Sequence, residues 1–264
     1  MFSDDSDWRF SDDFGELGMH LDVPYVPTDE RVVQKLLKLG AVDSSDLLFD
    51  LGSGDGRIVV QAALEFGARG VGVEMDPGRV AEASAYAAQM GVDDRVEFFE
   101  EDLFLTDFSR ATVVTLYLLH SANLDLRPRL LGELRPGARV LSHAFDMGEW
   151  RPDQRINHSG INLYMWVIPA RVGGSWYWQG SDGQEFLVEL EQTYQRIRGR
   201  AWINGQDAGL RAVLWGDLLE LIFHPESLEP LSIIMHCRGD ELMVLKGDRR
   251  GIVAGRVAPA ETGS

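Results

Sequence analysis

The stretch at residues 47–60, LLFDLGSGDGRIVV, constrains the fold of this chain more than any other. It joins a short apolar run, an acid, three glycines at every second position and a helical apolar pattern. This order predicts a strand, a tight loop and a helix, because residues without Cβ let the backbone turn sharply and let a charged ligand approach the backbone N–H groups. We therefore expect an α/β fold with a ligand site after its first strand.

Two interpretations of this glycine loop compete. A dinucleotide-binding fingerprint has the spacing G-x-G-x-x-G, but here the third glycine is Gly56 and Arg57 stands where the fingerprint needs glycine. Asp50 lies two residues before the first glycine, near the carboxyl end of the strand, where it would hold an ammonium group and repel a pyrophosphate. The spacing G-x-G-x-G therefore favours a zwitterionic ligand, and a glycine-rich turn without a ligand is the remaining alternative.

Acidic residues also follow the next two expected strands. GVGVE at 70–74 predicts a buried parallel strand that ends in Glu74, 22 positions beyond Gly52. A carboxylate at that place can accept hydrogen bonds from both hydroxyls of a ribose. A third strand is expected at 96–100, and Glu101 and Asp102 follow it. Three successive strands therefore deliver carboxylates to one edge of the sheet.

The first helix and the later strands complete the expected sheet. Thr28 is the expected N-cap of a helix with an apolar stripe, which precedes the glycine loop. The apolar run at 111–119 predicts a central fourth strand, buried on both faces, that delivers residues 120–123 to the ligand crevice. A helix at 124–134 and a fifth strand at 138–143 follow. We expect four residues from the ends of these two strands to border the crevice: Tyr117, His120, Asn123 and His143.

Together these motifs resemble class I methyltransferases that use S-adenosyl-L-methionine (SAM). Within this class the sequence resembles a bacterial group related to the mitochondrial protein-lysine methyltransferases that modify ATP synthase subunit c and the adenine nucleotide translocase. The resemblance covers residues 25–153 and rests on YVPT, DLGSGDGRIV, VGVEMDP, EDLF and the run from VVTLYLL to LRPGARVLSHAFDMGEW. The Asn-Pro-Pro-Tyr signature of amino-group and nucleobase methylases is absent, and LLHSAN stands in its place.

The resemblance implies a Rossmann-like seven-stranded methyltransferase sheet with SAM as its cofactor. It assigns the methionine part of SAM to Asp50, Gly52, Ser53 and Gly54, the ribose to Glu74, the adenine to Asp102, and the N-terminal cover of the site to Tyr25 and Thr28. The four crevice residues then become the candidates for the methyl-acceptor site.

The character of the chain changes after Pro169. Residues 170–264 hold eight short alternating runs at roughly ten-residue spacing, punctuated by Gly-Asp, Asn-Gly and Asp-Gly pairs. This pattern predicts an antiparallel meander that closes into a small barrel, and its opening GGSWYW is similar to lipocalin-like barrels. We expect an acidic tail at 1–21, a SAM-binding domain at 22–169 and an antiparallel β domain at 170–264, which selects the substrate, forms a homodimer or covers a sheet face.

Composition excludes several classes of partner. The 25 basic and 42 acidic residues give a net charge of −17, so no nucleic-acid partner is expected. One cysteine, Cys237, and histidines without ligand spacing predict no metal site. No apolar run approaches the roughly 20 residues of a membrane span, and the N-terminus lacks a signal pattern, so a cytoplasmic protein is expected.

These observations predict an enzyme that transfers a methyl group from SAM to an amino group, with protein lysine as the first candidate acceptor. One alternative is O- or N-methylation of a small molecule that the β domain encloses. A protein that binds SAM without transferring the methyl group is the other.

Overall fold

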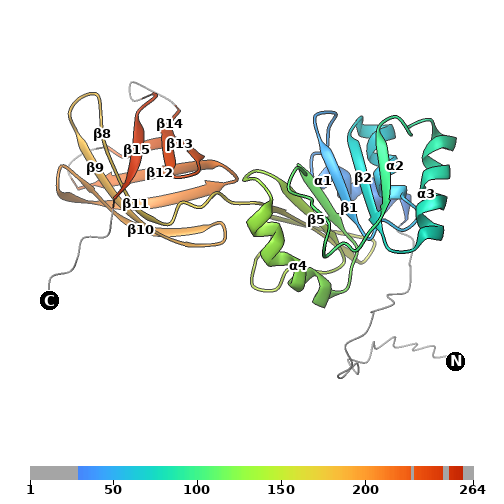
Figure 1. Cartoon of the computed structure of the whole chain (residues 1–264). Coiled ribbons are helices and arrows are strands. Elements are labelled where there is room, and N and C mark those ends of the chain that lie inside the picture. Colours follow the sequence, from blue (N-terminus) through green and yellow to red (C-terminus); the bar gives the residue numbers. More distant parts are fainter. Residues whose placement is uncertain (1–28, 227–228, 246–249, 258–264) are drawn as a thin grey trace, which may run out of the picture.

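A seven-stranded sheet flanked by helices is followed along the chain by a closed eight-stranded barrel (Figure 1), as the sequence predicts. The computed structural model describes residues 29–226, 229–245 and 250–257. The expected acidic tail, Tyr25 and Thr28 lie outside the described residues. The predicted domain boundary at 169–170 stays a prediction, and it falls between the last strand of the sheet and the first strand of the barrel.

The sheet has the strand order β3-β2-β1-β4-β5-β7-β6. Its elements are α1 (Glu30–Leu39), β1 (Leu47–Leu51), α2 (Arg57–Phe66), β2 (Arg69–Glu74), α3 (Pro77–Met90), β3 (Val96–Glu100), β4 (Val113–Leu116), α4 (His120–Glu133), β5 (Arg139–His143), β6 (Gln154–His158) and β7 (Ile161–Val167). Strands β1 to β5 pair in parallel, and β7 is antiparallel to both β5 and β6. The five parallel strands therefore end at one edge.

The local sequence explains most of these elements. Helix α1 buries an apolar stripe of Val32, Val33, Leu36 and Leu37 against the sheet. Its N-cap is Asp29, whose side chain accepts a hydrogen bond from the Arg31 N–H, so the prediction that Thr28 caps this helix is wrong.

Two features of the sheet differ from the sequence prediction. Helix α4 begins at His120, four residues before the predicted start, because a backbone cap at Leu119 without a side-chain hydrogen bond leaves no capping signal in the sequence. The hairpin of β6 and β7 was not predicted. Its register is set by pairing with β5, which a local pattern does not encode.

All eight predicted runs of the C-terminal region form strands. They are β8 (Gly174–Gln179), β9 (Glu185–Thr193), β10 (Arg196–Ile203), β11 (Gln206–Trp215), β12 (Leu218–Pro225), β13 (Leu231–Arg238), β14 (Glu241–Val244) and β15 (Val253–Val257). Each strand pairs with the next, and β15 pairs with β8, which closes the barrel. Each barrel strand that the structure describes therefore has a neighbour on both sides.

Arg256 fastens the two strands where the barrel closes. Its guanidinium lies 4.5 Å from the ring centroid of Trp176 and donates hydrogen bonds to the carbonyls of Gly173 (2.7 Å) and Arg171 (3.1 Å). The indole N–H of Trp176 donates to the Val172 carbonyl at 2.8 Å. The Arg256 Nε also lies 2.9 Å from the Asp240 carboxylate. A cation over a buried indole, with donors on backbone oxygens and on a carboxylate, ties β15 to the segment before β8.

The barrel interior is filled by side chains. Trp176, Trp178, Phe186 and Phe223 are almost fully buried there, with Trp178 stacked on Phe186 at 4.9 Å between ring centroids. Nineteen buried residues form one continuous apolar cluster. Among the described residues the barrel therefore has a packed core, and the proposed enclosure of a small substrate by this domain gains no support.

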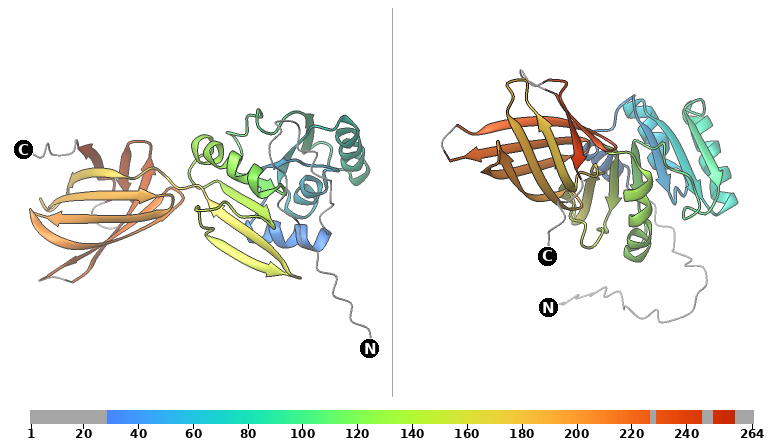
Figure 2. Two further views of the ribbon diagram at one scale, coloured as in Figure 1. Left: turned by 90° about the horizontal axis from the view of Figure 1, so that it is seen from below. Right: turned by 60° about the vertical axis from the view of Figure 1, so that its left-hand side comes forward.

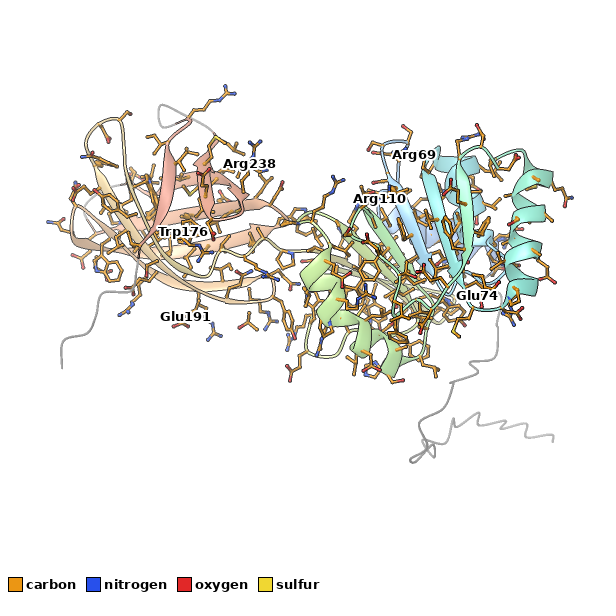
Figure 3. All side chains as sticks on the ribbon, viewed as in Figure 1. Arg69, Glu74, Arg110, Trp176, Glu191 and Arg238 are labelled. Carbon is orange, nitrogen blue, oxygen red and sulfur yellow. The ribbon has the colours of Figure 1, made fainter. Side chains whose placement is uncertain are left out.

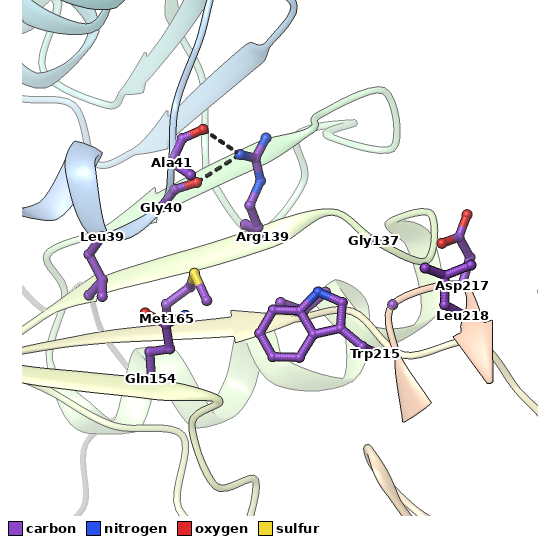
Figure 4. A pocket seen from close by; sticks show the side chains of 12 residues that line it. Leu39, Gly40, Ala41, Gly137, Arg139, Gln154, Met165, Trp215, Asp217 and Leu218 are labelled. Atoms are coloured by element: carbon purple, nitrogen blue, oxygen red, sulfur yellow. Dashed lines mark hydrogen bonds between the residues drawn. The ribbon is translucent and has the colours of Figure 1, made fainter. Parts of the chain in front are cut away.

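The barrel lies beside the sheet and not over its helices α2 and α3, as two further views show (Figure 2). Its β11–β12 hairpin reaches the edge where the parallel strands begin, because the Ala170 N–H donates to the Gly216 carbonyl and Gly216 lies against Gly137. A hollow of about 380 Å³ opens there (Figure 4), with Trp215 from the barrel and Met165 from β7 in its lining. This junction is at the opposite edge from the expected cofactor site.

Candidate functional site

The candidate site lies where the parallel strands end. Arg69 and Glu74 mark the two ends of β2 (Figure 3), and Glu74 is at the end that faces the site. The same edge receives the predicted residues of β1, of the segments after β3 and β4, and of β5. The topology therefore brings the described predicted residues to one edge of the sheet, where open α/β sheets bind ligands.

Asp50 is a buried carboxylate with one hydrogen-bond donor from a neighbouring strand. Its side chain is 2% exposed, and the Thr115 hydroxyl donates to it at 2.7 Å. Burial raises the pKa of Asp50 to about 7, against the lowering effect of Thr115 and with smaller raising effects from Asp55 and Glu74. A buried acid poised near neutrality would be held ionised by a cationic ligand group. Thr115 was not among the predicted residues, because its role depends on the pairing of β4 with β1.

The glycine loop uses its N–H groups internally. Those of Gly52 and Ser53 donate to the Val73 carbonyl at 2.8 and 2.9 Å, and that of Gly54 donates to the Glu74 carboxylate at 2.9 Å. The expectation that these N–H groups approach the ligand is therefore wrong for this structure. These hydrogen bonds hold the loop against β2, so the N–H groups of Gly52, Ser53 and Gly54 are already used, and the nearby charged group is the Asp50 carboxylate, which suits an ammonium better than an anion.

Side chains at two glycine positions of the loop would collide with neighbouring side chains. A Cβ on Gly56, whose φ is 77°, would lie 2.6 Å from the Phe98 ring and 2.8 Å from the Ala83 Cβ. A Cβ on Gly52, with φ of 82°, would lie 2.9 Å from Leu118. Both positions therefore need glycine for conformation and for space.

Ser53 has a buried hydroxyl without a partner. Its side chain is 6% exposed, and its Oγ has no hydrogen-bond partner among the described residues. Buried hydroxyls in proteins are nearly always hydrogen-bonded. An unpaired one in the loop that follows β1 indicates that this edge is built to receive a polar ligand.

Glu74 and Asp102 lie at the predicted positions after β2 and β3. One Glu74 oxygen accepts from the Met75 and Asp76 N–H groups at 3.0 and 3.1 Å, so the carboxylate is held in place by backbone donors. Asp102 accepts from the Phe104 N–H at 2.8 Å, which fixes the turn after β3. Carboxylate oxygens have room for further donors, such as ribose hydroxyls or an adenine amino group.

His143 and Tyr117 form a contact at the ends of β5 and β4. Their ring centroids are 3.9 Å apart with the rings at 76°, and His143 is 4% exposed. Neither ring nitrogen of His143 has a partner among the described residues. Burial lowers the pKa of His143 to about 4 and raises that of Tyr117, so both side chains are neutral at pH 7.

The other two predicted crevice residues lie on α4 and differ from each other. His120 is half-exposed, and its Nδ1 is 3.5 Å from the Asp146 carboxylate. Asn123 is fully buried, and its amide donates to the Ser142 hydroxyl at 3.2 Å and to the Phe145 carbonyl at 3.3 Å. Asn123 therefore joins α4 to the segment after β5, whereas His120 is open to the surface.

Neither a metal cluster nor a spanning helix occurs in the described part of the chain. No group of three or more His, Cys, Asp or Glu side chains could hold an ion there. The helices of that part lack the length and apolar character that crossing a membrane requires.

The residues present fit SAM. The ammonium of its methionine part matches the buried Asp50. Its polar groups can pair with the Ser53 hydroxyl, and its ribose matches Glu74. Among the described residues, the site's donor set contains no cluster of arginine or lysine that a pyrophosphate would need.

Comparisons with known proteins agree with this chemistry. Residues 50–154 match the family described as the ANTKMT methyltransferase domain. A protein-lysine N-methyltransferase of Saccharolobus islandicus is 42% identical over 154 residues, which cover 55% of this chain and 94% of the relative. The adenine nucleotide translocase lysine N-methyltransferase of Mus musculus is 35% identical, over 53% of this chain and 60% of its own length, so the chain spans less than two thirds of that relative.

A solved structure is similar over the same share of the chain. It is described as an RNA methyltransferase from Salinibacter ruber in complex with S-adenosyl-L-homocysteine (SAH). The two sequences are 54% identical with a TM-score of 0.55, and the match covers 56% of this chain and 96% of the other. The barrel lies beyond the residues that the family match covers.

Proposed function

Because the chain belongs to the methyltransferase family described as the ANTKMT methyltransferase domain, we propose that it methylates a lysine side chain of a protein. The chain is a SAM-dependent methyltransferase. The proposal of a lysine acceptor is supported by the match to nearly the full length of a protein-lysine N-methyltransferase. The neutral pair of His143 and Tyr117 at the site supports an amine acceptor.

SAM supplies an activated methyl group on a sulfonium, so the protein needs to align an uncharged nucleophile and to exclude water. We assign the methionine part of SAM to Asp50 and to the loop of Gly52, Ser53 and Gly54. We assign the ribose to Glu74 and the adenine to Asp102. The Thr115 hydroxyl holds Asp50 at the end of β1. Tyr25 and Thr28, which the structure does not describe, stay assigned to the cover of this site by resemblance alone.

His143 is suited to accept a hydrogen bond from the attacking amine. Its pKa of about 4 makes it a poor base for a lysine ammonium, whose ordinary pKa is about 10.4. A buried neutral imidazole can, however, orient an amine that has already lost its proton, and the Tyr117 ring beside it excludes water. We therefore assign His143 and Tyr117 to orienting the acceptor and not to removing its proton.

His120 and Asp146 give the proton of the lysine ammonium a way out. They face each other at 3.5 Å on the exposed rim, near the end of β5. Both side chains are half-exposed, so a lysine ammonium that pairs with the Asp146 carboxylate there can release its proton to water. The amine then enters the buried part of the site uncharged, which burial itself favours because desolvation disfavours the ammonium.

An RNA acceptor is the second candidate, because the similar Salinibacter ruber structure is described as an RNA methyltransferase. The net charge of −17 and the carboxylates at the site disfavour a polyanion. A small-molecule acceptor would have to bind at the sheet edge, since the barrel interior is filled.

The test is methyl transfer from methyl-labelled SAM into a cell lysate, with separate protease and RNase treatment and amino-acid analysis of the labelled protein. We expect protease-sensitive label that is recovered as methyl-lysine. His143→Ala should lower transfer by about tenfold or more while the dissociation constant for SAH changes less than about twofold. His158→Ala, on the β6–β7 hairpin, is the matched control and should leave both unchanged. Label that RNase removes, or label in the small-molecule fraction, would overturn the lysine proposal.

A further inference from the structure

The β9–β10 hairpin of the barrel contacts the segment that follows β5. The side chain of Gln195 accepts a hydrogen bond from the Trp150 indole N–H at 3.1 Å and donates to the Arg151 carbonyl at 2.7 Å and to the Asp153 carboxylate at 3.3 Å. Tyr194 stacks on Trp150, with ring centroids 6.1 Å apart and 25° between the planes. Two adjacent barrel residues thus hold one stretch of the methyltransferase sheet.

Tyr194 has an unfavourable backbone conformation in the turn of this hairpin, where its ring contacts Trp150. Tyr194 has a φ of 55°, a left-handed conformation that costs a side chain with a Cβ and that an aromatic residue rarely adopts. At four other barrel hairpins among the described residues the left-handed positions include a glycine: Gly183, Gly205, Gly216 and Gly239. A tyrosine at this place is explained by what its ring touches and not by the needs of the turn.

The contacted segment leads directly to the rim of the acceptor site. Met147 and Trp150 are fully buried and form an isolated bridge with each other, so residues 147–150 make one tight unit. Arg127 of α4 donates to the Met147 carbonyl at 2.8 Å, and its guanidinium also lies 6.0 Å from the centroid of the Tyr194 ring. Asp146, the next residue upstream, accepts from the Gly148 N–H at 2.9 Å and faces His120.

The connection between sheet and barrel is itself fixed by the same hairpin. The Gln192 side chain accepts from the Val172 and Gly173 N–H groups at 2.7 and 3.1 Å and donates to the carbonyls of Ala170 and Tyr194 at 2.8 Å each. The hairpin therefore lies at a defined place against the sheet, because the segment that joins the two regions is hydrogen-bonded to it.

We infer that Tyr194 and Gln195 are positioning residues of the methyltransferase site, through which the barrel holds the 146–150 segment and with it the Asp146–His120 pair. The inference rests on the proposed function, because that pair matters for the acceptor. The contacts of both residues lie on the segment that follows β5 and not on the cofactor loop, so they should affect methyl transfer to the acceptor and not SAM binding. The barrel then completes the acceptor side of the enzyme although it lies at the other edge of the sheet.

The experiment uses the full chain with Gln195→Ala, Tyr194→Gly and Tyr194→Phe. Gln206→Ala, an exposed glutamine in the hairpin at the other end of β10, is the matched control. Tyr194→Gly removes the ring and relieves the left-handed conformation, whereas Tyr194→Phe keeps the ring. The measurements are SAH affinity by calorimetry, label transfer from SAM into lysate protein, and the NMR resonances of the His120 and His143 rings.

We expect Gln195→Ala and Tyr194→Gly to lower label transfer by about tenfold, with SAH affinity within about twofold and a displaced His120 resonance. Tyr194→Phe and Gln206→Ala should behave as the parent. Unchanged transfer and resonances in Gln195→Ala and Tyr194→Gly would overturn the inference, as would a loss of SAH affinity equal to the loss of transfer. If the parent chain labels no protein, the lysine proposal fails, and the His120 resonance alone decides whether the hairpin positions the rim.

Discussion

The sheet region buries polar side chains, whereas the barrel buries almost only apolar ones. Every buried polar or charged residue among the described ones belongs to the sheet region: Asp46, Asp50, Ser53, Thr106, Thr115, Asn123, Ser142 and His143. Three of them, Ser53, Asn123 and His143, have side-chain atoms that no described residue satisfies, and all three lie at the carboxyl edge of the strands. The barrel buries tryptophan, phenylalanine and aliphatic side chains instead.

Buried apolar and buried polar side chains have different effects on a folded protein. A packed apolar core gives stability, whereas buried polar groups without partners cost stability unless a ligand satisfies them. The sheet edge therefore has the character of a ligand site, and the barrel that of a rigid support. The Trp178 indole N–H is an exception, since it is buried in the barrel without a hydrogen-bond partner among the described residues and packs against Phe186 and Phe223.

The largest effect is expected from Phe186→Ala in the barrel core. The ring is fully buried and stacked on Trp178, so its removal should destabilise the barrel by about 3–5 kcal/mol. Urea unfolding followed by tryptophan fluorescence measures this, with Tyr177→Ala on the outside of β8 as the control. SAH affinity should not change at urea concentrations where the barrel stays folded. A parallel loss of SAH affinity would break the comparison, because it would make the barrel core part of the cofactor site.

Asp50→Asn should raise the stability of the folded chain and weaken the binding of SAH, in contrast to Phe186→Ala. The pKa of Asp50 is about 7 in the folded chain against an ordinary 3.8, so between these values the folded state holds a proton that the unfolded chain has lost. Stability therefore falls as the pH rises through this window, and the full penalty is present above pH 7. Asparagine stays neutral and can still accept from Thr115, so we expect a gain of about 1–3 kcal/mol at pH 7.5.

The same variant should bind SAH at least about tenfold more weakly, since it cannot pair an ammonium by charge. Calorimetry and thermal melts at pH 7.5 test both halves. Asp43→Asn is the control: that acid is exposed, and the Ser45 hydrogen bonds lower its pKa, so its replacement should bring no gain in stability. A destabilised Asp50→Asn protein would show that the carboxylate has a structural role and is not held ready for a ligand.

A third effect is the pH dependence of SAH affinity. Below pH 7 the free chain carries a protonated Asp50, and the ligand ammonium must displace that proton. Affinity should therefore rise by up to about tenfold per pH unit between pH 5.5 and 7 and then level off. In Asp50→Asn the dependence over this range should disappear. If the parent chain shows a flat profile, the ammonium does not lie beside Asp50.

The sequence predicted local features and missed contacts across distant segments. The strand, loop and helix around Asp50 and all eight barrel strands follow from short-range patterns of apolar residues and turn residues. The hydrogen bond from Thr115 to Asp50 joins residues 65 positions apart, and that from Trp150 to Gln195 joins residues 45 apart. Neither contact leaves a periodic signal, because each depends on how distant segments pair and not on local sequence.

The smallest effect in this set is expected where the barrel closes, at Arg256. Lysine would keep the positive charge over Trp176 but lose the planar donors that reach the carbonyls of Gly173 and Arg171, so Arg256→Lys should cost about 1 kcal/mol. For a region of this size that is a fall of a few degrees in the melting temperature of the barrel. The β15–β8 ladder remains, so the barrel should still close, and SAH affinity should equal that of the parent.

Arg238→Lys, an exposed change on β13, controls for the general effect of replacing arginine. A change in SAH affinity without a change in melting would contradict the division of labour, because it would mean that barrel closure acts on the cofactor edge and not on barrel stability.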